Sequence, residues 1–544
     1  MPLIYFSRIS EAREEFFFAE IPRTKSQDHD AISISINQGE ATSSSDFKSQ
    51  YEKLPDYLKS CLDYSSFVTF KHSVDKDKLV RLLLSQGLVP DTPGKIMEEV
   101  AEKIVQGFIC LGMLRQGLLA EGLEIDDNYR QVCLLQVEEN DFVANSANSP
   151  VFALIYDDGK DIPPKFQGLQ VHSLFIMTFE RRSSESKDQG LSRAYMETVC
   201  SLKSLMVLDL EGIIECLPDE VENMVDLTYL GLYLSKLDEL PLTLANLQKL
   251  QTLDIRGCRL GNWHELPKEA LKIKQLRHLL MSHNTDNSEV TIPKGFGFGE
   301  MENLHTCDGV YGGGGIADEL GNLIQLRKLG VKRVGDDHSD ELVAAIMKMR
   351  NLISLSLEAE GSIFRNGTLF PEMEQFSPPA LLQDLHLFGG LVDIPNWLLS
   401  MENLTVLSLS FSRLLENQIS ALQVLPKLKH LTLWEASNGK YMSKGFCDPG
   451  GFKELETLEI ASSSLVEWTE IVNGAFPSLR FLSFRNCMKL EFLPEGLQNI
   501  SSLQQLCIFP VYTDIVRRLY GDENYKIKHI QDVMLYELPS ALLQ

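Results

Sequence analysis

A leucine spacing that recurs along the C-terminal part of the chain limits its possible folds more than any other feature. The pattern L-x-x-L-x-L occurs at Leu205, Leu208 and Leu210 and begins again 22 residues later at Leu227. With conservative replacements it runs through thirteen copies, 22 to 30 residues apart, whose first positions are Leu205, Leu227, Leu250, Leu276, Leu304, Leu326, Leu352, Leu382, Leu404, Leu428, Leu455, Leu479 and Leu503. Such a period predicts stacked units rather than one rounded core.

The spacing is typical of a leucine-rich repeat. Each copy predicts a short strand in which Leu208 and Leu210, for example, point inward while Val207, Asp209 and Glu211 point outward, because side chains alternate across a strand. One strand cannot bury its leucines alone, so neighbouring units stack them into a continuous core. We therefore predict an α/β fold: a horseshoe-shaped solenoid with a parallel sheet on one face, whose outward side chains form a binding surface.

Two recurring features fit the chain between the predicted strands. Leucine or isoleucine followed by proline recurs at Leu217-Pro218, Leu240-Pro241, Leu266-Pro267, Ile292-Pro293, Ile394-Pro395 and Leu493-Pro494. Proline fixes φ and lacks a donor, so it suits a return segment rather than a sheet. Cys258 and Cys487 each lie three residues past the last apolar strand position, where a buried structural thiol is expected.

The region before the repeats divides into three parts. Residues 1–49 form a polar, serine-rich extension that we expect to be partly disordered. Residues 50–120 predict a small helical domain, and residues 121–200 a connecting segment with an irregular first repeat, ahead of the repeat domain at 201–544. The helical prediction rests on apolar residues at helical spacing: Leu54, Leu58, Cys61, Leu62, Leu79, Leu82, Leu83, Met97, Val100, Ile104 and Phe108.

A family resemblance joins these two regions. "LPDYLKSCLDYSSF", "KLVRLLLSQGLV" and "MEEVAEKIVQGFICLGML" resemble the winged-helix subdomain of plant intracellular nucleotide-binding leucine-rich-repeat disease-resistance proteins of the coiled-coil class. "LPDEVENMVDLTYLGL", "LGNLIQLRKLGV" and the ending "RRLYGDENYKIKHI" resemble the repeats of the same family. The resemblance implies a winged-helix-like domain, a cytoplasmic protein, and a role in plant defence. It also implies a protein ligand: a pathogen effector, a guarded host protein or a partner immune receptor.

The sequence departs from that family in its nucleotide motifs. It has no G-x-x-x-x-G-K-[ST] phosphate loop: Gly94-Lys95 is followed by Ile96, and Gly159-Lys160 by Asp161. The Met-His-Asp motif of the family is replaced by "YRQVCLLQVEEN". We therefore expect no nucleotide cofactor and no nucleotide-driven switching.

Composition argues against several other classes. The net charge is -25, and the nine Lys/Arg of residues 51–120 are matched by nine Asp/Glu, so a nucleic-acid partner is not expected. The ten cysteines contain no C-x-x-C pair, and the eleven histidines have no metal-ligand spacing. No apolar run is long enough for a membrane span, and the N-terminus lacks the pattern of a secretory signal. No catalytic constellation occurs, so the chain is not expected to be an enzyme.

The outward strand positions remain as the candidate site. Aromatic and arginine side chains are frequent binding hot spots, and those that the alternation places outward are Tyr229, Tyr233, Arg256, His386, Phe388, His430, Trp434, Phe481 and Arg485, with Lys328 and Lys332. Trp434 ends the clear strand pattern "LKHLTLWE" and is the foremost candidate for contact with a partner. The alternative is that some of these side chains pack beneath neighbouring loops.

Two other functions remain open at this point. "LPDYLKSCLDYSSF" superficially resembles the opening of an F-box, which would make the chain a substrate adaptor of a ubiquitin ligase. The helices that follow match the winged helix better. The chain could also be a fragment of a full nucleotide-switch immune receptor.

Overall fold

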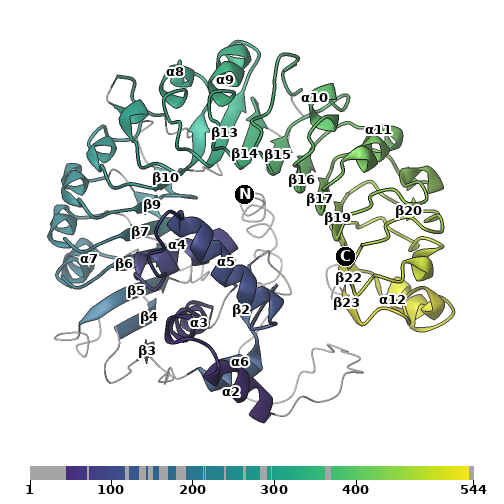
Figure 1. The fold of residues 1–544 in the computed structure, drawn as a ribbon, viewed down its shortest axis with the longest axis horizontal. Coiled ribbons are helices and arrows are strands. Elements are labelled where there is room, and N and C mark those ends of the chain that lie inside the picture. The colour runs from purple at the N-terminus through teal and green to yellow at the C-terminus, as the bar shows by residue number, and fades with distance from the viewer. Residues whose placement is uncertain are drawn as a thin grey trace, which may run out of the picture. The chain divides into compact units, whose positions relative to one another are not determined.

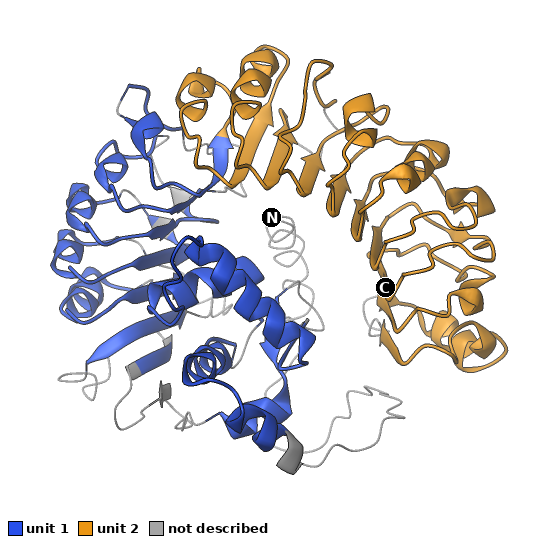
Figure 2. Ribbon diagram, viewed as in Figure 1, with its two compact units in different colours: residues 1–9, 40–310 blue, residues 10–39, 311–544 orange. Residues whose placement is uncertain are grey.

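A computed structural model describes residues 44–69, 73–116, 122–133, 142–144, 151–157, 170–178, 191–211, 214, 216–233, 235–237, 240–260, 265–281, 291–295, 297–361 and 369–537. The predicted extension over 1–49 lies almost entirely outside the described residues. The chain forms two compact units (Figure 2), the first comprising residues 1–9 and 40–310 and the second residues 10–39 and 311–544.

Unit 1 opens with helices, as the apolar periodicity predicts. They are α2 (Ser44–Glu52), α3 (Asp56–Val68), α4 (Lys76–Ser85), α5 (Met97–Cys110) and α6 (Asp127–Val132), with the antiparallel pair β1 (Leu114–Gln116) and β2 (Leu123–Ile125) between α5 and α6. Asp75 caps α4 by accepting a hydrogen bond from the Lys78 amide, and Glu98 and Glu99 occupy the first turn of α5, where the helix dipole favours acidic groups. The winged-helix assignment of this region stays a prediction.

The rest of unit 1 is a stack of parallel strands. After β3 (Phe142–Ala144), which is antiparallel to its neighbour, come β4 (Val151–Asp157), β5 (Val171–Thr178), β6 (Val207–Glu211), β7 (Tyr229–Tyr233), β9 (Thr252–Asp254), β11 (His278–Leu280) and β12 (Thr306–Tyr311). The returning segments hold α7 (Arg193–Cys200), the 3-10 turns η2 (Asp219–Asn223), η3 (Leu242–Asn246), η4 (Ala270–Lys272) and η5 (Phe298–Glu300), and the short pair β8 (Lys236–Leu237) and β10 (Arg259–Leu260).

Unit 2 repeats the same plan. Its parallel strands are β13 (Lys328–Val334), β14 (Ser354–Ala359), β15 (Asp384–Phe388), β16 (Val406–Ser410), β17 (His430–Trp434), β19 (Thr457–Ala461), β21 (Phe481–Arg485), β22 (Gln505–Val511) and β23 (Asp532–Glu537). The other elements are α8 (Ile316–Leu320), α9 (Ser339–Ile346), α10 (Asn396–Leu399), α11 (Glu416–Ser420), η6 (Ala421–Val424), β18 (Tyr441–Met442), η7 (Lys444–Phe446), β20 (Glu467–Trp468), η8 (Leu497–Asn499), α12 (Thr513–Tyr520) and η9 (Asn524–Lys526). The predicted α/β leucine-rich-repeat solenoid is thus confirmed.

The repeat pattern explains why these elements form. All thirteen first-position leucines, each just before a strand, are at most 2% exposed, so every repeat contributes leucine to the core between sheet and return segments. Several of the predicted prolines open a helical turn: Pro218 precedes η2, Pro241 precedes η3 and Pro395 precedes α10.

The two cysteines predicted to be structural link neighbouring repeats. The Cys258 thiol donates to the Leu232 carbonyl at 2.7 Å and the Cys487 thiol to the Ile460 carbonyl at 3.6 Å, each in the preceding repeat. Both residues are buried, and burial raises the pKa of Cys487 to about 12. The prediction of a structural role is confirmed for both residues.

Candidate functional site: the strand faces

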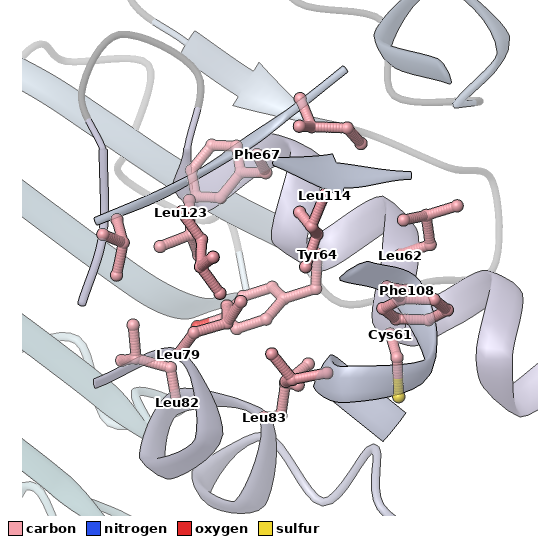
Figure 3. Packing of buried hydrophobic residues seen from close by; sticks show 14 of the residues in the cluster. Cys61, Leu62, Tyr64, Phe67, Leu79, Leu82, Leu83, Phe108, Leu114 and Leu123 are labelled. Carbon is pink, nitrogen blue, oxygen red and sulfur yellow. The ribbon is translucent and has the colours of Figure 1, made fainter. Parts of the chain in front are cut away.

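The outward face of the first strands in unit 1 is covered by the helices of the same unit. Figure 1 shows α4 lying against β7. The helical core continues onto the sheet, because outward residues of β4 to β7 belong to one hydrophobic cluster with α3, α4 and α5; these residues are Phe152, Leu154, Phe175, Val207 and Tyr229. In Figure 3, Tyr64 of α3 faces Leu79, Leu82 and Leu83 of α4, and Phe67 lies on the side of Leu123.

Aromatic rings and hydrogen bonds fix helix α3 on the sheet. The Phe67 ring lies 5.6 Å from that of Phe152 and 5.8 Å from that of Phe175, centroid to centroid, within the range of favourable aromatic pairs. The Tyr64 hydroxyl lies 2.9 Å from Ser173 Oγ, which also accepts a bond of 2.7 Å from Gln86 Nε2. A tyrosine buried this deeply needs such a partner, so the contact is specific as well as apolar.

A buried ion pair joins α4 to the sheet. Lys78 Nζ lies 2.6 Å from Asp209 Oδ2, an outward side chain of β6. Burial disfavours the charge on Lys78, but Asp209, Glu211 and Asp254 outweigh it and raise the lysine pKa. The backbone of β7 makes room for this pair: a Cβ on Gly231 would lie 2.2 Å from Asp209 Oδ1.

A second charged cluster joins α5 to the later strands of unit 1. Arg277 donates to both oxygens of Glu98, at 2.8 Å from Nε and 2.6 Å from Nη2. His278 Nε2 and His305 Nδ1 lie 3.4 and 3.3 Å from Glu98 Oε1. Burial opposes the Glu98 charge, but its bonds with His278, His305 and Arg277 hold the pKa of the carboxyl well below its usual range. We call Glu98, Arg277, His278 and His305 the Glu98 cluster.

The predicted site residues of unit 1 are placed differently from expectation. Tyr229 is fully buried among the helices, so the expectation that it lies on an open face is wrong. Arg256 is also withdrawn from solvent, since its guanidinium forms a pair at 2.7 Å with the buried Asp254. Tyr233, at the end of β7, is partly exposed. The outward positions predicted from the alternation are correct. The alternation alone does not reveal that helices of the same chain cover this face.

The predicted residues of unit 2 differ among themselves in exposure. His430 is exposed, and His386, Phe481, Lys328 and Lys332 are partly exposed. Arg485 lies along the sheet and pairs with Glu459 at 3.2 Å. Phe388 and Trp434 are 6% and 8% exposed, so the expectation of two open aromatic side chains is wrong. The strand register brings His386 of β15, His430 of β17 and Phe481 of β21 to the same face of the sheet.

Sequence reasoning missed the residues that hold the helices on the sheet. Neither Glu98 nor Lys78 stands out in the sequence, because each is one acidic or basic residue on a mixed helix. A signal did exist for β4 and β5: "VFALIYD" and "VHSLFIMT" are nearly continuous apolar runs, which indicate strands buried on both faces. No such run occurs in unit 2 at "LTLWE" or "LSLSF", where polar residues alternate with the leucines.

Among the described residues, no group of three or more His, Cys, Asp or Glu could hold a metal ion. Within the same residues, no helix is both long and apolar enough to cross a membrane.

Stacked parallel strands with buried leucines and short return segments define the class of leucine-rich-repeat proteins. The family model described as "Leucine-rich repeat region" matches residues 190–520, which is more than half of the chain, and the chain belongs to this family.

Similar proteins extend the relationship beyond the repeats. A putative disease resistance protein of Arabidopsis thaliana is 28% identical over 89% of this chain and 54% of its own length. Disease resistance protein RPM1 of the same plant is 26% identical over 89% of this chain and 53% of its own length. The resemblance to plant disease-resistance proteins is thereby confirmed, and the chain spans about half the length of the curated relatives it matches. Among solved structures, a leucine-rich-repeat protein of Leptospira interrogans matches with a TM-score of 0.39 at 18% identity, over 70% of this chain and 94% of that one.

Proposed function

We propose that this chain is a non-enzymatic recognition protein of the plant defence response, acting in the cytoplasm. It binds another protein through the strand face of unit 2: a pathogen effector, a guarded host protein or a partner immune receptor. The observation that carries the proposal is the relationship to disease resistance proteins over 89% of the chain, which includes both the helical region and the repeats.

The chemistry of the face in unit 2 supports this assignment. His430 is exposed, Phe481 is half-buried, and both lie on strands that share one parallel sheet. Aromatic and imidazole side chains on a rigid sheet lose little conformational freedom on binding, which favours them as partner contacts. The face of unit 1 is a poorer candidate because α3, α4 and α5 already cover it.

The test is capture of partners from plant tissue with the intact chain as bait, followed by binding measurements on each partner. We expect a defence-related protein that binds saturably, and at least ~10-fold weaker binding for the double variant His430→Ala, Phe481→Ala. Tyr441→Ala, an exposed aromatic on β18 and away from the strand face, is the matched control and should bind like the wild type.

Other outcomes separate the alternative functions. Co-purification of the adaptor subunit that binds F-boxes would identify a ubiquitin-ligase substrate adaptor. Tight, saturable binding of ATP or ADP would contradict a chain without nucleotide switching. If the double variant bound the partner as tightly as the wild type, the recognition site would lie elsewhere than on this face.

A further inference from the structure

The Glu98 cluster contains more basic groups than its acid can neutralise. Within the described part of the chain, the ion pairs of Arg277, His278 and His305 all go to Glu98. Arg277 stays charged at every accessible pH and binds both carboxylate oxygens, so it alone neutralises Glu98. A proton on His278 would therefore add a second positive charge beside a carboxylate that is already paired.

The hydrogen bonds of His278 fit a neutral ring. Nδ1 lies 3.1 Å from Thr306 Oγ1 on β12, whose hydroxyl can donate to it, and Nε2 lies 3.4 Å from Glu98 Oε1, to which an Nε2–H can donate. The residue is only 5% exposed. Burial lowers the pKa of His278 to about 4, with further lowering by Arg81 of α4 and Arg277 of its own segment, while Glu98 opposes the shift.

We propose that the Glu98 cluster is an acid-sensitive clamp, in which protonation of His278 detaches the start of α5 from β11 and β12. The charged groups that face His278 are Glu98 from α5, Arg81 from α4 and Arg277 beside it; His305, which shares Glu98, is the remaining titratable neighbour. Only Glu98 among them favours the proton.

The direction and size of the pH effect on α5 detachment follow from the pKa of His278 in the detached and in the clamped state. A detached His278 takes up a proton at about its free pKa of 6.5, whereas the clamped ring resists protonation down to about 4. The clamp thus contributes fully above pH 6.5 and is lost progressively as the pH falls from 6.5 to 4. Between pH 7.5 and pH 5 the equilibrium constant for detachment should rise ~30-fold.

Hydrogen exchange of the full chain tests the clamp directly. Exchange of the α5 amides is followed between pH 7.5 and pH 5 and corrected for the intrinsic pH dependence of exchange, with the amides of β21 and β22 as an internal reference. We expect opening of α5 to increase ~30-fold while the reference stays unchanged. Opening of α5 that does not change with pH would overturn the proposal.

Variants separate the clamp from general acid sensitivity. His278→Gln keeps a donor toward Glu98 but cannot titrate, so the pH dependence of α5 opening should flatten. Persistence of the wild-type pH dependence in this variant would overturn the proposal. His338→Gln, in unit 2, is the matched control and should leave the pH dependence of α5 opening as in the wild type. Thr306→Val keeps both histidines but removes the hydroxyl that stabilises the neutral His278 ring. The midpoint of the pH-dependent opening of α5 should therefore move to higher pH. An unchanged midpoint in this variant would count against the clamp. This inference is independent of the proposed recognition function.

Discussion

Removing either partner of the Glu98–Arg277 pair should loosen the helices of unit 1 from the sheet. The two bonds of 2.8 and 2.6 Å are bidentate, Glu98 is 9% exposed and Arg277 is 27% exposed at the side chain. Breaking a fully buried pair costs about 3–5 kcal/mol, chiefly because it strands the remaining charge. Arg277 is partly screened by solvent, so we expect ~2–3 kcal/mol for Glu98→Gln and a similar loss for Arg277→Met.

The double variant distinguishes a coupled pair from two independent losses. With both charges removed, no charge is stranded, and the combined cost should fall ~1.5–3 kcal/mol short of the sum. Local opening of α5, measured by hydrogen exchange at pH 7.5, reports the free energies. Glu302→Gln, an exposed glutamate of unit 1, is the matched control and should change the opening free energy by less than ~0.5 kcal/mol. Strict additivity of the two losses would refute the view that this pair holds α5 on the sheet.

Four further variants test other contacts. Gly231→Ala should destabilise unit 1 by ~1–3 kcal/mol, because the new Cβ would lie 2.2 Å from Asp209 Oδ1. A Cβ on Gly107 in α5 would meet nothing within 4 Å, so Gly107→Ala should stabilise unit 1 by ~0.5–1 kcal/mol. Urea unfolding measures both changes. Trp468→Ala should cost ~3–5 kcal/mol, since Trp468 packs against Phe446 at 5.3 Å and Phe476 at 6.2 Å; an unchanged melting temperature would contradict this core role. Of the ten cysteines only Cys110 is exposed, so one thiol should react rapidly with a thiol reagent, and Cys110→Ser should abolish that rapid phase. Burial raises the pKa of Cys61 to about 12, so rapid labelling of Cys61 would show that the helical core opens.

The repeat could be predicted from the sequence because it depends on local rules. A leucine at each first position, a period-2 strand and a proline at the return segment are all read from neighbouring residues, and Leu205 to Leu503 lie in the core as expected. The strand β23 was missed because "VMLYE" follows no leucine at the first position, and its pairing with β22 depends on stacking alone.

The covering of the strand face in unit 1 by helices could not be predicted, because it depends on contacts between residues far apart in the sequence. Glu98 and Arg277 are 179 residues apart, and Thr228 donates to the Ser85 carbonyl across 143 residues. No local pattern encodes such pairs. Tyr229 therefore looked like a binding residue, although its ring fills the core between α4 and β7.

The residue types at the outward positions differ between the strands that the helices cover and the strands of unit 2. In β5, β6 and β7 they include Phe175, Val207 and Tyr229, which would be costly to leave in water and which the helices bury. In β14 and β16 the central outward residues are Ser356 and Ser408, which are small and polar. Other outward residues of unit 2 form ion pairs along the sheet: Lys332 with Glu358 at 3.7 Å and Arg485 with Glu459 at 3.2 Å. The outward positions of β15 to β21 combine small residues with aromatic ones such as Phe481. A partner that binds this face would therefore contact the Arg485–Glu459 ion pair as well as aromatic rings.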